Sequence, residues 1–331
     1  MEETQDREMV VLNIKTVGVV GAGTMGSAIA EVMALNGYSV VLKDISDQLL
    51  ERGKRNIERI LTHLVEYHER RAPEEIKRIE SLGIKLTEEQ IETVRNALRP
   101  AYDRSTISQT IERIRFTTAY SDMDGCDVVI EAAFEKPEVK KEIFRELDKH
   151  LGDEAIRATN TSSIPITSLA SSIKNPGLLL GTHFFNPPYT LPLVEVIPGL
   201  QTEERVVNEI ISFLKNLRNH RRQMLPIRVK DSPGFVVNRM IVPAQNEACF
   251  ILQEGLATAK DIDEAMKAGA GWPMGPLELA DMVGLDIAYD VAAMLYNEFG
   301  DPKYRPPTLL KRMVEAGYLG RKTGRGFYEY G

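Results

Sequence analysis

The sequence predicts an α/β fold, in which a doubly wound parallel sheet precedes an all-α C-terminal domain. Three observations predict it. Short apolar segments rich in β-branched residues alternate with helical patterns up to about residue 230. A glycine-rich turn follows the first of these segments. Beyond residue 235, four helical patterns follow one another.

The glycine-rich turn is typical of a dinucleotide-binding domain of the Rossmann type. Residues 17–20 form an apolar strand, and Gly21, Gly23 and Gly26 follow it in G-x-G-x-x-G spacing. Gly21 permits a tight turn, Gly23 lets the backbone approach a pyrophosphate, and Gly26 lets the next helix pack close to the strand. The free N–H groups at the start of that helix favour phosphates. FAD can use a similar turn, so the turn alone does not name the cofactor.

The carboxylate after the second strand favours NAD over NADP. Residues 39–42 form that strand, and Asp44 lies eighteen positions after Gly26. An acidic side chain near this distance binds the ribose hydroxyls and would repel a 2′-phosphate. Thr24 and Met25, between the second and third glycines, are the other expected contacts of the cofactor.

Composition limits the classes of function. The chain has 331 residues, enough for two domains, and its net charge of −7 argues against a nucleic-acid surface. Cys126 and Cys249 have neither metal nor redox spacing, so two reduced thiols are expected. No apolar segment is long enough for a membrane helix, and residues 1–8 resemble no targeting signal. Cytoplasm is therefore the expected location.

A long, charged helical insertion is expected between the second and third strands, at about residues 52–113. A helix should begin at Asp47, and three or four short amphipathic helices should follow it. Pro73 suits the first position of one of them. Thr87 and Gln90 have the spacing of a capping box.

The remaining strands complete the sheet, and a turn at residues 231–234 marks the expected domain boundary. We therefore expect an NAD-binding domain at residues 12–230 and a helical substrate and dimerisation domain at 231–331. The expected later strands are residues 114–117, 127–131, 178–184, 191–197 and 227–230, with helices at 137–151 and 203–217 among them.

His183 and Glu195 are the candidate catalytic pair. His183 ends one expected strand, and Glu195 interrupts the next apolar strand, where a buried charge needs a partner. If the strands are neighbours, Glu195 accepts a hydrogen bond from one ring nitrogen and raises the basicity of the other. Such a base suits the oxidation of an alcohol by a nicotinamide. The alternative for a single histidine is a purely structural role, which we expect for His63, His68, His150 and His220. No pair has the spacing of a metal site.

Several motifs together give the chain a resemblance to the L-3-hydroxyacyl-CoA dehydrogenase family, and to its short-chain 3-hydroxybutyryl-CoA members. They extend from Val17 to Tyr330 and are V-G-V-V-G-A-G-T-M-G, V-V-I-E-A-A-F-E, N-T-S-S, H-F-F-N-P, L-V-E-V, K-D-S-P-G-F-V-V-N-R, G-A-G-W-P-M-G-P-L-E-L-A-D and K-T-G-R-G-F-Y-E-Y.

The resemblance implies NAD as cofactor, an acyl-CoA substrate, a homodimer and a role for each matching position. His183 matches the base and Glu195 its acidic partner. Ser162, Asn186 and Asn238 match groups that hold the reacting oxygens of the substrate or close the site. Their alternative is ordinary turn and cap chemistry. The matches to residues beside the nicotinamide are Glu135 and Lys140.

Two segments depart from the family pattern. The charged insertion is longer than usual, and the connection at residues 216–228 is longer and more basic. The expected reaction is oxidation of a (3S)-3-hydroxyacyl-CoA, such as 3-hydroxybutyryl-CoA, to the 3-ketone. The alternatives are a dehydrogenase of the same fold for a non-CoA hydroxy acid, such as carnitine or a sugar acid, and a non-catalytic NAD(H)-binding protein.

Overall fold

The computed structural model describes residues 14–331, which divide into two compact units between Asp231 and Ser232. The expected domain start at residue 12 and residues 1–8 lie outside the described part. None of the helices between residues 14 and 331 combines the length and apolarity that a membrane crossing requires.

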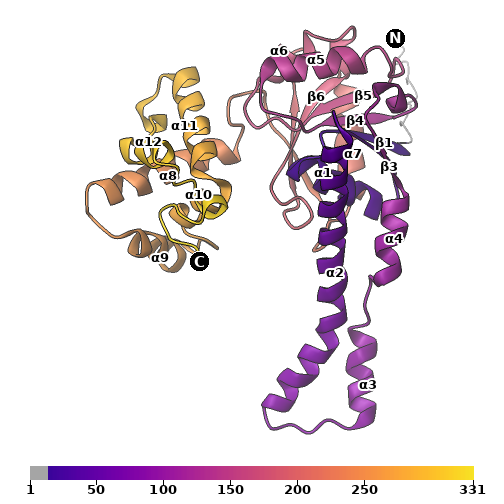
Figure 1. The fold of residues 1–331 in the computed structure, drawn as a ribbon, viewed down its shortest axis with the longest axis vertical. Helices are drawn as coiled ribbons and strands as arrows, with labels where there is room; N and C mark the ends of the chain where they lie inside the picture. Colours follow the sequence, from indigo (N-terminus) through magenta and orange to yellow (C-terminus); the bar gives the residue numbers. More distant parts are fainter. Residues whose placement is uncertain (1–13) are drawn as a thin grey trace, which may run out of the picture. The chain divides into compact units, whose positions relative to one another are not determined.

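The first unit is built on one eight-stranded sheet with the order β3-β2-β1-β4-β5-β6-β7-β8 (Figure 1). The order reverses between β1 and β4, which is the switch point where an open α/β sheet binds its ligand. The strands are β1 (Thr16–Val20), β2 (Ser39–Lys43), β3 (Ile114–Thr117), β4 (Val128–Glu131), β5 (Ile156–Thr159), β6 (Leu179–Phe184), β7 (Leu193–Pro198) and β8 (Leu225–Arg228).

Strands β1 to β6 are parallel, whereas β7 pairs antiparallel to β6 and β8 pairs parallel to β7. The doubly wound α/β fold is therefore confirmed, with its last two strands reversed. A short connection at residues 185–192 explains the reversal, because a parallel neighbour would need a long crossover.

Helices cover both faces of the sheet. Helix α1 (Thr24–Leu35) and helix α7 (Glu204–Asn216) pack on one face, where Ile29, Met33 and Ile210 join the buried strand residues. The other face of β1 contacts the 3-10 helix η1 (Tyr120–Met123). The contact is close, since a Cβ at Gly18 would lie 2.8 Å from the Met123 sulfur. Helices α5 (Pro137–Leu147) and α6 (Ile166–Ala170) pack together, and η2 spans Pro176–Leu178.

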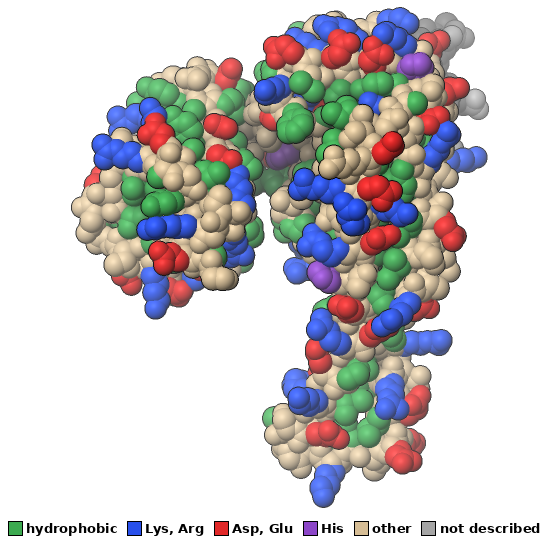
Figure 2. Space-filling view, viewed as in Figure 1, with side chains coloured by type: hydrophobic (Ala, Val, Ile, Leu, Met, Phe, Trp, Pro, Cys, Tyr) green, Lys and Arg blue, Asp and Glu red, His purple; other side chains and the backbone are tan. Residues whose placement is uncertain are grey.

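The charged insertion forms an arm that projects from the sheet (Figure 1). Helix α2 (Asp47–Ser81) runs along it, α4 (Arg104–Glu112) packs beside α2 and α1, and α3 (Glu88–Ala97) packs on α2. In Figure 2, side chains of both charge signs cover the arm around a narrow apolar strip. The capping box of Thr87 and Gln90 is confirmed.

The expected helix start at Pro73 is wrong, because Pro73 lies inside α2. Proline removes one backbone hydrogen bond, to the carbonyl of Glu69, and Glu69 is exposed, so water can satisfy that carbonyl. One helix of 35 residues therefore replaces both the helix expected from Asp47 and the separate helix expected to begin at Pro73.

The second unit is helical and fastens its C-terminal turn with buried acids. Asp281 accepts hydrogen bonds from the backbone N–H groups of Phe327 and Tyr328 at 2.9 and 3.0 Å. Asp263 accepts one from the Tyr328 hydroxyl at 2.7 Å. The helices are α8 (Val237–Gln253), α9 (Ala259–Ala270), α10 (Pro276–Val283), α11 (Leu285–Phe299) and α12 (Thr308–Glu315), with η3 (Pro302–Tyr304) and η4 (Arg321–Thr323).

Candidate active site

The glycine turn connects β1 to α1 at the switch point of the sheet. Gly21 has φ +106°, and a Cβ at Gly26 would lie 1.7 Å from the Gly21 carbonyl oxygen, so both positions require glycine. Gly23 differs, because a Cβ there would meet nothing within 4 Å. The space beside Gly23 is open, as the close approach of a pyrophosphate requires.

The start of α1 fits an anion. Gly23 is its N-cap and supplies no side-chain hydrogen bond, and the first turn holds no acidic residue. Thr24 is exposed and Met25 is half-buried at this end. The helix start therefore offers its backbone N–H groups and the positive end of its dipole to a phosphate.

Asp44 lies at the end of β2, beside the same turn. Its Oδ2 accepts a hydrogen bond from the Ala22 N–H at 2.6 Å, and its Oδ1 accepts one from the Ile45 N–H at 2.6 Å. A carboxylate oxygen accepts more than one hydrogen bond, so ribose hydroxyls can still bind. Lys43 is buried over the Tyr120 ring, 3.7 Å from its centroid, and so turns away from Asp44, as strand alternation requires.

Replacing Gly23 with aspartate should weaken NADH binding by at least about tenfold, or ~1.4 kcal/mol, without lowering the melting temperature. The φ of −68° at Gly23 suits any residue, and aspartate is a good helix N-cap, but its carboxylate would repel the pyrophosphate. Gly152→Asp is the matched control, since Gly152 is also exposed and open. Fluorescence titration with NADH measures the effect. An unchanged affinity in Gly23→Asp would show that the cofactor does not bind at this turn.

His183 and Glu195 are directly opposite each other in the antiparallel pair of β6 and β7. The His183 Nδ1 lies 2.8 Å from the Glu195 Oε2, and both side chains are buried. The structure thus brings together the two residues that the sequence singled out. A carboxylate on Nδ1 fixes the imidazole tautomer and leaves Nε2 to accept a proton.

Glu135 holds the turn that carries Ser162. Its Oε1 accepts hydrogen bonds from the Ser162 N–H at 2.9 Å, the Ser163 N–H at 3.1 Å and the Ser163 hydroxyl at 3.0 Å. The Thr161 hydroxyl also donates to it. Burial raises the pKa of Glu135, but the Lys140 charge and these hydrogen bonds outweigh burial, so its pKa lies below its ordinary value.

Lys140 is buried and reaches two carboxylates. Its Nζ lies 2.8 and 2.9 Å from the two Glu131 oxygens and 3.2 Å from the Glu135 Oε2. Glu131 also accepts hydrogen bonds from the Thr159 hydroxyl and the Ala133 N–H, each at 2.6 Å. Sequence reasoning missed Glu131, although an acid in an apolar strand was the signal that had identified Glu195.

Three asparagines, of which Asn186 and Asn238 are predicted site residues, lie in different places. The Asn160 side chain accepts a hydrogen bond from the Phe184 N–H at 2.9 Å, which fastens the Ser162 turn to the strand of His183. Asn186 is exposed, two residues after β6. Asn238 is the second residue of α8, in the other unit.

The other groups that could bind a metal or act as nucleophiles are dispersed. Within residues 14–331, no group of three or more His, Cys, Asp or Glu side chains could hold a metal ion. Both cysteines are buried, which raises the pKa of each thiol to about 12. Their thiolates are therefore scarce at neutral pH.

The sheet order, the glycine turn and Asp44 together define a dinucleotide-binding protein of the Rossmann class. Two family models match the chain. The model described as 3-hydroxyacyl-CoA dehydrogenase, NAD binding domain, matches residues 16–97 and 76–232. The model described as 3-hydroxyacyl-CoA dehydrogenase, C-terminal domain, matches residues 234–330.

Individual proteins are similar over nearly the whole chain. A probable 3-hydroxybutyryl-CoA dehydrogenase of Deinococcus radiodurans is 41% identical over 95% of this chain and 99% of the relative. A 3-hydroxybutyryl-CoA dehydrogenase of Clostridioides difficile is 38% identical over 94% of this chain and 98% of its own. The crystal structure of (S)-3-hydroxybutyryl-CoA dehydrogenase from Ralstonia eutropha has a TM-score of 0.79 and 43% identity, covering 96% of this chain and 99% of that one.

This chain belongs to the 3-hydroxyacyl-CoA dehydrogenase family of NAD-dependent oxidoreductases. The predicted family, fold class and cofactor are thereby confirmed.

Proposed function

We propose that the protein oxidises the 3-hydroxyl of a (3S)-3-hydroxyacyl-CoA, with 3-hydroxybutyryl-CoA as substrate, and also catalyses the reverse reduction. The observation that carries the proposal is the buried His183–Glu195 pair, 2.8 Å between Nδ1 and Oε2, in a chain of this family. The names of its relatives support the choice of a short acyl chain.

His183 is the proposed general base. Glu195 keeps the proton on Nδ1, so Nε2 takes the hydroxyl proton of the substrate and returns it in the reverse direction. Glu195 also stabilises the imidazolium that results, as a buried carboxylate beside a histidine does. Bound NAD supplies the acceptor for the hydride that leaves the same carbon.

Three polar side chains are the proposed substrate contacts. Ser162, Asn186 and Asn238 carry hydrogen-bond donors for the hydroxyl or the thioester carbonyl. Glu135 fixes the Ser162 backbone, and Lys140 fixes Glu135, so the serine turn keeps its place as the substrate binds. The Ser162 hydroxyl lies 3.4 Å from the Glu135 Oε1, a weak contact that a substrate oxygen can replace.

Two further features belong to this proposal. We propose a homodimer formed through the second unit, and exposed apolar side chains there support it. They include Met240, Leu256, Met282, Val283 and Ile287. We also propose a cytoplasmic location, which the two buried, free cysteines support.

The test of the proposed reaction is NADH oxidation by the purified protein with acetoacetyl-CoA, beside free acetoacetate. Turnover that depends on CoA supports the acyl-CoA substrate. Equal rates with both compounds would favour a non-CoA hydroxy acid, and NADH binding without turnover on any candidate would favour a non-catalytic protein.

A further inference from the structure

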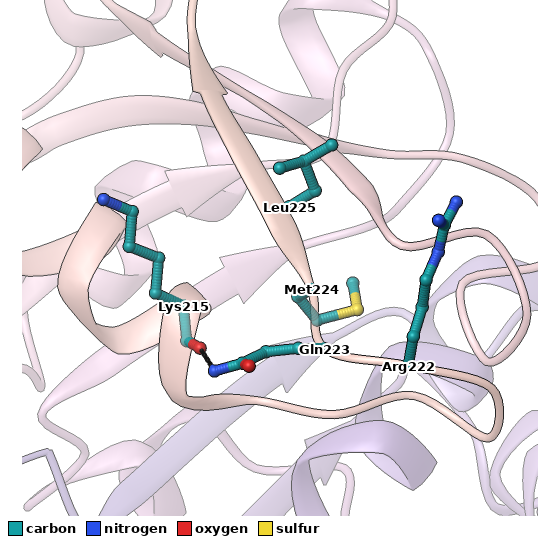
Figure 3. Close-up of a pocket in the computed structure, with 5 residues that line it drawn as sticks. All are labelled: Lys215, Arg222, Gln223, Met224 and Leu225. Atoms are coloured by element: carbon teal, nitrogen blue, oxygen red, sulfur yellow. Dashed lines mark hydrogen bonds between the residues drawn. The ribbon is translucent and has the colours of Figure 1, made fainter.

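The connection between α7 and β8, residues 217–224, contains none of the residues assigned to the proposed reaction. Hydrogen bonds nevertheless hold it to two neighbouring parts of the first unit. It forms a tight turn that is closed by an antiparallel β-bridge between Arg218 and Gln223. Figure 3 shows the Gln223 side chain pointing to the Lys215 carbonyl, to which it donates a hydrogen bond, at a surface pocket. Met224 is buried in the core beneath it.

This turn is attached to α1, the helix of the nucleotide site. The Asn36 side chain donates to the Arg218 carbonyl at 2.8 Å and accepts from the Arg218 N–H at 2.9 Å. Five residues earlier on α1, Glu31 is completely buried, and its Oε1 lies 2.8 Å from the His220 Nε2.

The same turn is attached to the loop that carries Asn186. The His220 N–H donates to the Tyr189 carbonyl at 3.0 Å, and the two rings lie 5.2 Å apart. The Asn219 side chain donates to the Pro188 carbonyl at 3.3 Å. His220 therefore touches α1 with its ring nitrogen and the Asn186 loop with its backbone and ring face.

The hydrogen bond from His220 offsets part of the cost of burying Glu31. A buried carboxylate is costly unless it is hydrogen-bonded, and Glu31 Oε2 has no hydrogen-bond partner within residues 14–331. His220 supplies the partner of Oε1. The imidazole is consequently held in one position between α1 and the loop.

We propose that His220, anchored by Glu31, is a positioning residue that sets the Asn186 loop relative to the nucleotide-binding helix. The inference rests on the proposed function for its effect on catalysis. Glu31 lies eight residues after Gly23, on the helix whose start faces the pyrophosphate. The clamp of Glu31, His220 and Tyr189 thereby links the nucleotide-binding helix to the loop of Asn186, a proposed substrate contact.

The test compares His220→Leu with His220→Gln. Leucine has similar bulk but cannot bond Glu31, so kcat/KM for acetoacetyl-CoA should fall about tenfold through displacement of the loop. The Kd for NADH should stay within about twofold, because the start of α1 is unchanged. Glutamine carries an amide nitrogen that can donate to Glu31, so His220→Gln should restore most of the loss.

Hydrogen exchange gives a readout that does not depend on activity. The Thr190 and Leu191 N–H groups both bond the Pro187 carbonyl, and their exchange should quicken in His220→Leu and recover in His220→Gln. Unchanged exchange, or a kcat/KM within about twofold of wild type, would overturn the clamp. An inactive wild type would instead overturn the proposed function, and exchange alone would then decide the inference.

A double variant distinguishes positioning from stability. Glu31→Leu with His220→Leu removes the buried carboxylate together with its partner, so the melting temperature should recover. Positioning predicts that kcat/KM stays low in this variant, whereas its recovery along with the melting temperature would show a purely structural role. The same variant serves if His220→Leu alone does not fold.

Discussion

Replacing His183 with alanine should lower kcat for acetoacetyl-CoA by about 10²- to 10⁴-fold, the range that a general base contributes. The Kd for NADH should change little, since the glycine turn and Asp44 belong to other strands. Steady-state kinetics and an NADH titration on the same preparation measure the two effects.

His183→Gln is the matched control for this experiment. Its amide can still donate a hydrogen bond to Glu195, but it cannot accept a proton, so activity should fall as far as in His183→Ala while more stability remains. A rate within about tenfold of wild type in either variant would show that another group is the base.

Replacing Lys140 with methionine should destabilise the protein by about 3–5 kcal/mol, because it leaves the fully buried Glu131 without its counter-ion. Urea unfolding measures the loss. Lys149→Met is the control, since Lys149 is exposed and pairs with Glu146 at the surface. A loss no larger than that of the control would mean that the buried ion pair is not needed for folding.

Lowering the pH should narrow the difference in the free energy of unfolding between Lys140→Met and the wild type. The folded-state pKa of Glu135 lies below its ordinary value of 4.5. Ionised Glu135 therefore stabilises the folded protein, and this stabilisation is fully present at pH values above the ordinary one. This contribution disappears as the pH falls through the lowered pKa. In the variant, Lys140 no longer contributes to this stabilisation of Glu135. The free energies of unfolding of the variant and the wild type, measured against pH, should therefore converge in acid.

The local features of the fold could be predicted from the sequence. The spacing of Gly21, Gly23 and Gly26 identified the turn. The charge of Glu195 within an apolar strand led to its pairing with His183 on the condition that their strands are neighbours, and they are neighbours in the sheet. Both depend on residues near each other in the chain or in adjacent strands. The capping box of Thr87 and Gln90 is a local feature of the same kind.

Long-range polar contacts could not be predicted in this way. Glu31 and His220 are 189 positions apart, and nothing near either residue indicates the other. A general rule about proline placed a helix start at Pro73, but an exposed helix tolerates the lost hydrogen bond. The role of Asn238 stays a prediction.

The most direct test of the central claim is the rate of NADH oxidation by wild-type protein with acetoacetyl-CoA, measured beside free acetoacetate. We predict rapid turnover with the CoA ester, very slow turnover with the free acid, and 3-hydroxybutyryl-CoA formed in equal amount to the NADH consumed. Tight NADH binding with no oxidation by acetoacetyl-CoA would contradict the assignment of His183 and Glu195 to this reaction.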